Sequence, residues 1–271
     1  MWFHTGVGLQ NKVIVGLGPA LLFCAGCTST MPDRDVRMTR AYIYYLDGAG
    51  GAGVILNWSR GVRKGLLDAG YDGAGEVFVW QTRLGVAADQ LADVRYKRSK
   101  AAELAAAIQK RTREHPGVPV HLIGLSAGTA VLVFTLEALP ENCKVESAIL
   151  LGASLSAEHD LTAALKRVRQ KMYVFTSEKD AVLKFLVPMA GTADRERNGA
   201  GPAGLRGFRM PANAPAETRR QYSKLVHRRW TKAYERAGNY GGHTDAVNPR
   251  FVREHVAPLI VNARRGQVLS P

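Results

Sequence analysis

The sequence predicts an α/β domain built on a mostly parallel sheet of about six strands, with helices on both faces. From residue 41, short runs rich in β-branched and aromatic residues alternate with longer helical runs, as in strands joined by crossover helices. Most of the short runs are apolar at nearly every position, which is typical of strands buried on both faces. The chain has 271 residues, 46% of them hydrophobic, which is enough for one such domain with a sizeable core.

The expected strands lie at residues 41–46, 76–80, 120–125, 147–152 and 172–177, with a weaker sixth at 225–230. The expected helices lie at residues 53–69, 98–114, 128–138, 160–169 and 249–262. Two connections, 81–97 and 184–218, contain more chain than they need, and loops of that length are usually functional or disordered. We therefore expect residues 184–218 to form a lid or a substrate-binding loop.

The first 27 residues carry the features of an export signal. Residues 13–26 form an apolar run of 14 residues behind Lys12, short for a membrane span and typical of a signal-peptide core. The small residues before Cys27 resemble the lipobox of bacterial lipoproteins, in which that cysteine carries the lipid, although Cys24 stands where leucine is usual. The alternatives are a plain secretory peptide and a misassigned start codon.

This N-terminus predicts where the protein is found and how the chain is divided. Residues 1–27 would be the signal peptide, 28–40 a tether, and 41–265 the folded domain. The resemblance implies an exported protein held in the cell envelope by a lipid on Cys27. Cys143 would then be the remaining cysteine of the mature domain, with no partner for a disulfide. No set of Cys and His has zinc spacing, so we expect no metal.

The formal net charge is +14, from 37 Lys and Arg against 23 Asp and Glu. A charge of this size raises the question of nucleic-acid binding, but no helix-turn-helix, zinc-finger or RNA-binding motif accompanies it. The densest basic stretch comprises Arg219, Arg220, Lys224, His227, Arg228, Arg229 and Lys232. It is interpreted as a solvated basic face, or as a surface attracted to anionic lipid head groups or envelope polymers.

The motif with the clearest chemistry is Gly124-Leu-Ser126-Ala-Gly128, which directly follows a predicted strand and precedes a predicted helix. A sharp turn there would hold Ser126 in a strained conformation at the carboxyl end of the sheet, with glycines relieving crowding on both sides. The backbone N–H of Ala127, at the positive end of the helix, could then donate to an oxyanion.

A serine hydroxyl is a poor nucleophile at neutral pH, so a histidine must take its proton and an acid must orient that histidine. His243 is the best-placed base, in a glycine-rich turn before the last predicted helix. Its rivals are His159, His227 and His255. For the acid, Asp180 follows the 172–177 strand at the edge where Ser126 is expected. Glu178 and Asp245 are weaker candidates.

The loop after the first strand, residues 47–53, has two interpretations. As an oxyanion loop it would offer a second backbone N–H, from Ala49 or Gly50. As a dinucleotide-binding fingerprint, Gly48, Gly50 and Gly53 form a GxGxxG between a strand and a helix. The second interpretation needs an acidic residue after the next strand, where the chain instead continues into Gln81, Thr82 and Arg83. We therefore expect no nucleotide cofactor.

With these motifs in place, the chain resembles the α/β-hydrolase family of serine hydrolases, including lipases and esterases, over residues 41–262. The order Ser126, Asp180, His243 matches the family's nucleophile, acid and base. Two departures stand out. The chain has no room for the usual first two strands, and Asp47 replaces a histidine that many lipases and esterases carry, which leaves the oxyanion donors' geometry open.

The resemblance implies cleavage of a carboxylic ester or related acyl bond, with a small-molecule or lipid acyl substrate and no cofactor. Apolar residues of the 184–218 segment would line an acyl pocket or simply pack the segment down. The alternative from a different class is a non-catalytic envelope lipoprotein that uses the same fold for binding or scaffolding. Such a protein should have lost part of the triad, whereas all three residues are present here.

Overall fold

The computed structural model describes residues 33–261, apart from 54–55, 83 and 196–199. The predicted signal peptide, Cys27 and residues 28–32 of the predicted tether lie outside the described residues. Of the tether, residues 33–40 are described, and they contain a short helix, α1 (Arg34–Met38). Within the described part of the chain, no helix is both long and apolar enough to cross a membrane.

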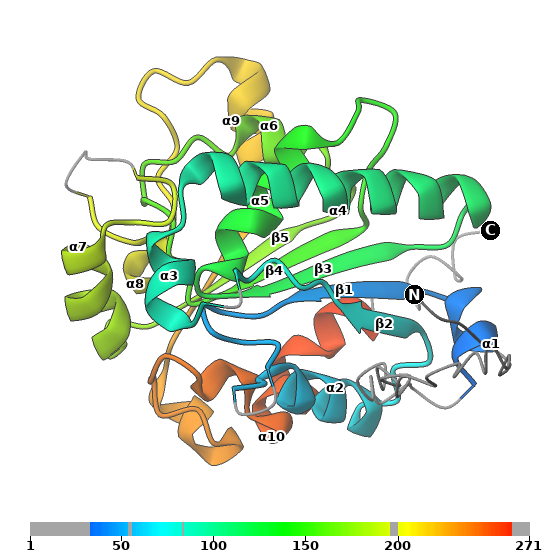
Figure 1. Cartoon of the computed structure of the whole chain (residues 1–271), viewed down its shortest axis with the longest axis horizontal. Coiled ribbons are helices and arrows are strands. Elements are labelled where there is room, and N and C mark those ends of the chain that lie inside the picture. Colours follow the sequence, from blue (N-terminus) through cyan, green and yellow to red (C-terminus); the bar gives the residue numbers. More distant parts are fainter. Residues whose placement is uncertain (1–32, 54–55, 83, 196–199, 262–271) are drawn as a thin grey trace, which may run out of the picture. The chain divides into compact units, whose positions relative to one another are not determined.

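Six parallel strands form a single sheet in the order β2-β1-β3-β4-β5-β6, which confirms the predicted fold class (Figure 1). The strands are β1 (Tyr42–Leu46), β2 (Ala74–Val77), β3 (Val120–Leu125), β4 (Ser147–Leu151), β5 (Met172–Thr176) and β6 (Leu225–Arg229). Strands β1, β3 and β4 are buried at every position, as their apolar sequences require.

Helices cover both faces of the sheet (Figure 1). The helices α4 (Val94–Glu114), α5 (Gly128–Ala138), α6 (Thr162–Lys166) and α9 (Ala216–Tyr222) pack on one face. The other face carries α2 (Ser59–Asp68), the 3₁₀ turns η2 (Lys232–Ala237) and η3 (Asp245–Val247), α10 (Pro249–Phe251) and the π-helical turn η4 (Val252–Val256). Alternate residues of each strand serve the two cores, so Tyr42 and Tyr44 face one and Ile43 and Tyr45 the other.

The order of the strands places a topological switch point between β1 and β3. The chain leaves β1 toward α2 on one face and leaves β3 toward α5 on the other. The loops after these strands therefore leave the carboxyl edge in opposite directions, and this is the position at which open parallel sheets bind ligands. The residues that follow β1 and β3 are the 47–53 loop and Ser126.

The two long connections contain short helices that the sequence did not indicate. Residues 81–97 include α3 (Val86–Leu91), and α4 begins four residues earlier than expected because Asp93 caps it by accepting from the Arg95 N–H. The described part of residues 184–218 contains most of a π-helical turn, η1 (Val182–Leu186), then α7 (Val187–Ala190), α8 (Ala203–Arg206) and the start of α9. Cys143 is buried and free.

Candidate active site

Ser126 occupies the turn between β3 and α5 with φ at 51°, in the left-handed region that residues with a side chain rarely adopt. Its N–H donates to the Leu151 carbonyl at 2.9 Å, which ties the turn to the end of β4. A Cβ on Gly128 would lie 2.5 Å from the carbonyl oxygens of Leu46 and Asp47, so only glycine allows α5 to start this close to β1. Close packing therefore sustains the strained turn that the GxSxG pattern predicts.

Asp180 and His243 meet at the same edge. The Nδ1 of His243 lies 2.7 Å from Oδ2 of Asp180, and the other oxygen of this buried carboxylate accepts from the Leu183 N–H at 3.0 Å. The hydrogen bond to Asp180 favours the tautomer with the proton on Nδ1, which leaves Nε2 free to act as an acceptor. This is the arrangement that a general base requires.

Gly152 links this pair to the serine. It follows Leu151, the residue that accepts the Ser126 N–H, and a Cβ placed on it would lie 3.6 Å from both Oδ2 of Asp180 and Nδ1 of His243. The three candidate residues thus border the end of β4. Within the described residues the hydroxyl of Ser126 and Nε2 of His243 make no hydrogen bond to each other. Such contacts are often long in free enzymes and tighten when substrate binds.

The histidine loop is held by its own hydrogen bonds. The Tyr240 and Gly242 N–H groups donate to the Asp245 carboxylate, and the Gly241 carbonyl accepts from the Ser177 hydroxyl at 2.7 Å. Asp245, a weaker candidate for the acid, therefore organises the loop and makes no bond to His243. The other weaker candidate, Glu178, is paired with Arg206.

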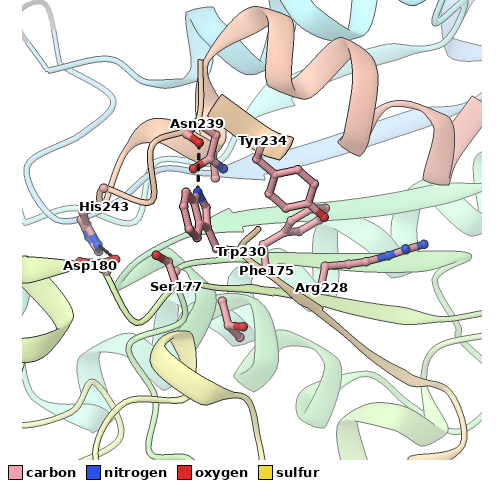
Figure 2. A pocket seen from close by; sticks show the side chains of 12 residues that line it. Phe175, Ser177, Asp180, Arg228, Trp230, Tyr234, Asn239 and His243 are labelled. Carbon is pink, nitrogen blue, oxygen red and sulfur yellow. Dashed lines mark hydrogen bonds and ion pairs between the residues drawn. The ribbon is translucent and has the colours of Figure 1, made fainter. Parts of the chain in front are cut away.

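A small cavity of about 20 Å³ lies beside His243 and Asp180, with room for about one water molecule (Figure 2). Trp230, Tyr234 and Phe175 line it, and the Trp230 indole N–H donates to the Asn239 carbonyl at 3.0 Å. These rings pack beneath the histidine loop. The cavity therefore borders His243 and Asp180 but not Ser126, which is absent from its lining.

The three rival histidines lie elsewhere. His159 is bound between Asp194 and Glu137, and Nε2 of His227 accepts from the Phe208 N–H at 3.1 Å. His255 packs against Tyr234, with ring centroids 4.6 Å apart. In the part of the chain that the structure describes, His243 is the histidine that contacts Asp180.

The side chain of Asp47 lies within the 47–58 loop. Its buried carboxylate accepts four hydrogen bonds, from the Tyr45 hydroxyl and from the N–H groups of Gly48, Ala52 and Trp58. Burial raises the pKa of this carboxyl, and the four hydrogen bonds oppose the rise. The carboxylate therefore shapes the loop after β1.

The backbone N–H groups of this loop differ in whether they already have a hydrogen-bond acceptor. The Gly50 N–H donates to the buried Asp89 carboxylate at 2.7 Å and so is engaged, while the N–H groups of Ala49 and Ala127 make no hydrogen bond to any described residue. A Cβ on Gly48 would lie 3.4 Å from the Ser126 Cβ, which places the loop against the serine. Of the two donors expected in this loop, Ala49 therefore has an N–H without a described partner, and Gly50 does not.

Sequence reasoning missed the residues that fix this loop from the other side. The Trp80 indole N–H donates to the Asp47 carbonyl at 2.8 Å, and the Gln81 amide donates to the Gly48 carbonyl at 3.0 Å. Asp89 also accepts from the N–H and hydroxyl of Thr82. The sequence did offer one signal for them. These residues follow the second predicted strand, and the carboxyl ends of parallel strands meet at one edge of the sheet, so contact with the 47–53 loop could have been expected.

No protein-family model and no curated protein sequence matches this chain. Among solved structures, it is similar to a cutinase-like protein from Cryptococcus sp., at 14% identity over 83% of this chain and 94% of the other, with a TM-score of 0.45. It is also similar to an acetyl xylan esterase, at 14% identity over 84% and 98%, with a TM-score of 0.43. A carboxylesterase, CesB from Bacillus subtilis, is similar at 15% identity over 82% and 84%, with a TM-score of 0.36. Likenesses this distant transfer neither activity nor substrate.

Proposed function

We propose that the chain is a serine hydrolase that cleaves a carboxylic ester or a related acyl bond. The observation that carries the proposal is the 2.7 Å hydrogen bond between His243 and Asp180, formed at the sheet edge where Ser126 stands in a strained turn. The combination matches the needs of an activated nucleophile.

The chemistry proceeds in two halves. Ser126 Oγ attacks the carbonyl carbon while its proton passes to Nε2 of His243, and Asp180 stabilises the imidazolium that forms. The oxyanion of the tetrahedral intermediate accepts hydrogen bonds from the N–H groups of Ala127 and Ala49. Collapse transfers the proton to the leaving alcohol and leaves an acyl group on Ser126. Water, deprotonated by His243, then attacks the acyl-enzyme and releases the acid.

A fluorophosphonate probe tests the nucleophile directly, because it forms a covalent bond with an activated serine hydroxyl. We expect the wild-type protein to be labelled at Ser126, and hydrolysis of a short p-nitrophenyl ester to fall by about 10⁴-fold or more in Ser126→Ala. Ser223→Ala is the matched control, since its exposed hydroxyl donates to the Arg220 carbonyl between α9 and β6 and has no imidazole partner among the described residues. A folded wild type that takes up no probe would favour the non-catalytic scaffold.

A further inference from the structure

A second cleft of about 600 Å³ lies beside the turn that carries Asp180 and remains unassigned by the proposed hydrolysis. Glu178 of that turn, Lys184 of η1 and Arg206 of α8 line it, and β6 contributes His227 and Arg229. Ser126 and His243 do not border it. The cleft is large enough for a small organic molecule, since ligand pockets commonly begin at about 300 Å³.

The alternation of side chains along β6 explains why only some residues of the basic stretch border this cleft. Side chains alternate along a strand, so His227 and Arg229 lie on one face of β6 and Arg228 lies on the other. Arg228 accordingly borders the small cavity near Trp230 instead. The basic stretch that the sequence presents as one surface is thus divided between two sides of the sheet.

The lining is strongly cationic. Among the described residues that border the cleft, four carry a positive charge, Lys184, Arg206, Arg209 and Arg229, and one, Glu178, carries a negative charge. Arg206 bonds Glu178, and this bond, together with the charges of Lys184 and Arg229, lowers the Glu178 pKa. Several cations therefore share one carboxylate.

Two of these cations are without a fixed partner. Arg209 pairs with Glu158 at 3.3 Å, whereas Lys184 and Arg229 form no ion pair with any residue that the structure describes. Like charges brought to one cleft repel each other, and an anionic ligand relieves that repulsion. The remaining lining includes apolar groups, among them Leu205 and Phe208, on which the body of an organic ligand can pack.

His227 also borders the cleft, and a hydrogen bond fixes its ring. Its Nε2 accepts from the Phe208 N–H at 3.1 Å, an approach that requires Gly207, since a Cβ there would lie 2.6 Å from that nitrogen. A ring that accepts at Nε2 carries its proton on Nδ1. Burial and the nearby Arg229 lower the pKa of His227, so the ring stays neutral and keeps this tautomer near pH 7.

We propose that this cleft binds a small organic molecule that carries two or more negative charges on oxyanion groups. Lys184 and Arg229 supply the free positive charges, Arg206 exchanges part of its bond to Glu178 for the ligand, and Leu205 and Phe208 contact the ligand's apolar part. The proposal concerns binding alone and does not depend on the hydrolysis proposed for Ser126.

Calorimetric titration of the full chain with pyrophosphate and with citrate, in a buffer of low ionic strength, tests the proposal. We expect at least one of the two probes to bind with a stoichiometry of one, and which of them binds tells phosphate from carboxylate chemistry. Lys184→Glu and Arg229→Glu should each weaken that binding about tenfold or more, since each replaces an attractive charge by a repulsive one. Arg113→Glu, at the exposed end of α4, is the control with the same change in net charge and should have less than about a twofold effect.

Glu178→Gln gives an expectation of opposite sign, because it removes the carboxylate that competes for Arg206 and should tighten binding several-fold. Ser126→Ala should bind the probe as the wild type does, which separates this proposal from the hydrolase proposal. The proposal is overturned if neither probe binds, or if Arg113→Glu weakens binding as much as the two cleft variants, since the attraction would then be that of the whole charged chain.

Discussion

The two sides of the candidate active site are held in different ways. On the β1 side, the 47–53 loop is fixed at its backbone by buried groups: the Asp47 and Asp89 carboxylates, Trp80 and Gln81. On the other side, η1 and α7 leave the large apolar side chains of Phe185, Leu186 and Met189 more than half exposed. The loop that would present the oxyanion donors is thus held by buried hydrogen bonds before any ligand arrives, whereas η1 and α7 keep several large apolar side chains in solvent.

The chain that follows η1 and α7 is attached to the rest of the domain at a point away from the site. His159 lies between the Glu137 carboxylate at 2.7 Å and the Asp194 carboxylate at 3.1 Å, and Asp194 also accepts from the Ser156 N–H. Lys97, fully buried, donates to the carbonyls of Gln90 and Ala193. The chain after α7 is therefore attached at residues 193–194, while Phe185, Leu186 and Met189 stay exposed before that point.

Within this comparison, the largest effect is expected from Gly128→Ala, which disrupts the side held in place by buried groups. The new Cβ would meet two backbone oxygens at 2.5 Å, so the turn at Ser126 must move away from β1. We expect the rate of fluorophosphonate labelling to fall by about 100-fold or more, because displacing a nucleophile by about 1 Å costs that much. Gly53→Ala, where the nearest atom to a new Cβ is 3.8 Å away, is the control from the adjacent loop and should label normally.

The next effect tests the positioning of the second oxyanion donor. Asp89→Asn keeps the shape of the side chain but replaces one acceptor oxygen by a donor, so it cannot satisfy both the Gly50 N–H and Thr82. We expect kcat for a short ester to fall about tenfold with KM nearly unchanged, as for a weakened transition-state contact. Asp68→Asn, on the exposed surface of α2, serves as the control. Equal kcat values for the Asp89 and Asp68 variants would mean that the loop needs no such support.

A smaller effect concerns stability and the anchor at His159. Burial opposes a charge on this ring, but its hydrogen bonds to Asp194 and Glu137 outweigh burial and raise the His159 pKa to about 9. Since this lies above the ordinary value of about 6.5, the stabilisation is complete below pH 6.5 and is lost as pH rises through 9. We expect Tm of the wild type to fall by several degrees more than that of His159→Gln between pH 7 and pH 10.

The quantity to compare is the difference in Tm between the wild type and His159→Gln at each pH, because other groups also titrate between pH 7 and pH 10. Lys97, whose pKa burial lowers to about 8, titrates in both proteins, so the difference between the two curves reports the part that depends on His159. Parallel curves for the wild type and His159→Gln across this pH range would show that the ring carries no proton-linked stabilisation.

The smallest effect is expected on the loosely packed side. The double variant Phe185→Ser/Met189→Ser removes side chains that are 66% and 86% exposed, so stability should change by less than about 0.5 kcal/mol for each. If these residues contact an acyl chain, KM for an octanoyl ester should rise about threefold or more while KM for an acetyl ester stays constant. Comparison of the two esters within one variant is the control. An equal change in KM for both esters would show that these side chains do not contact the acyl chain.

The sequence predicted the bounds of an element well where its local residue pattern matches the burial of that element in the folded protein. Strand β3 and helix α5 have the predicted bounds, because uninterrupted apolar runs fit elements buried on all sides. Strand β2 begins two residues earlier than predicted and ends at Val77, which the apolar run to Trp80 did not indicate. The short helices of residues 182–206 have too few turns to show a period.

For the site, local motifs indicated the residues and long-range contacts decided their surroundings. Ser126, Asp180 and His243 each follow a strand or a glycine-rich turn, which a single segment can reveal. The engagement of Gly50 by Asp89 joins residues 39 positions apart, and the hydrogen bond from the Trp80 indole to the Asp47 carbonyl joins residues 33 positions apart. Pairings of this kind have no signature within one segment.

The sheet ends in two outer strands that have backbone groups facing away from their single partners. At one end β2 has only four residues, and Glu76 within it pairs with Arg34 of α1. At the other end β6 exposes two consecutive arginines, Arg228 and Arg229. Short length and charge are the features by which natural sheets discourage strand-to-strand aggregation with another copy. The same arginines that divide between two cavities therefore also make growth of the sheet into a neighbouring molecule unfavourable.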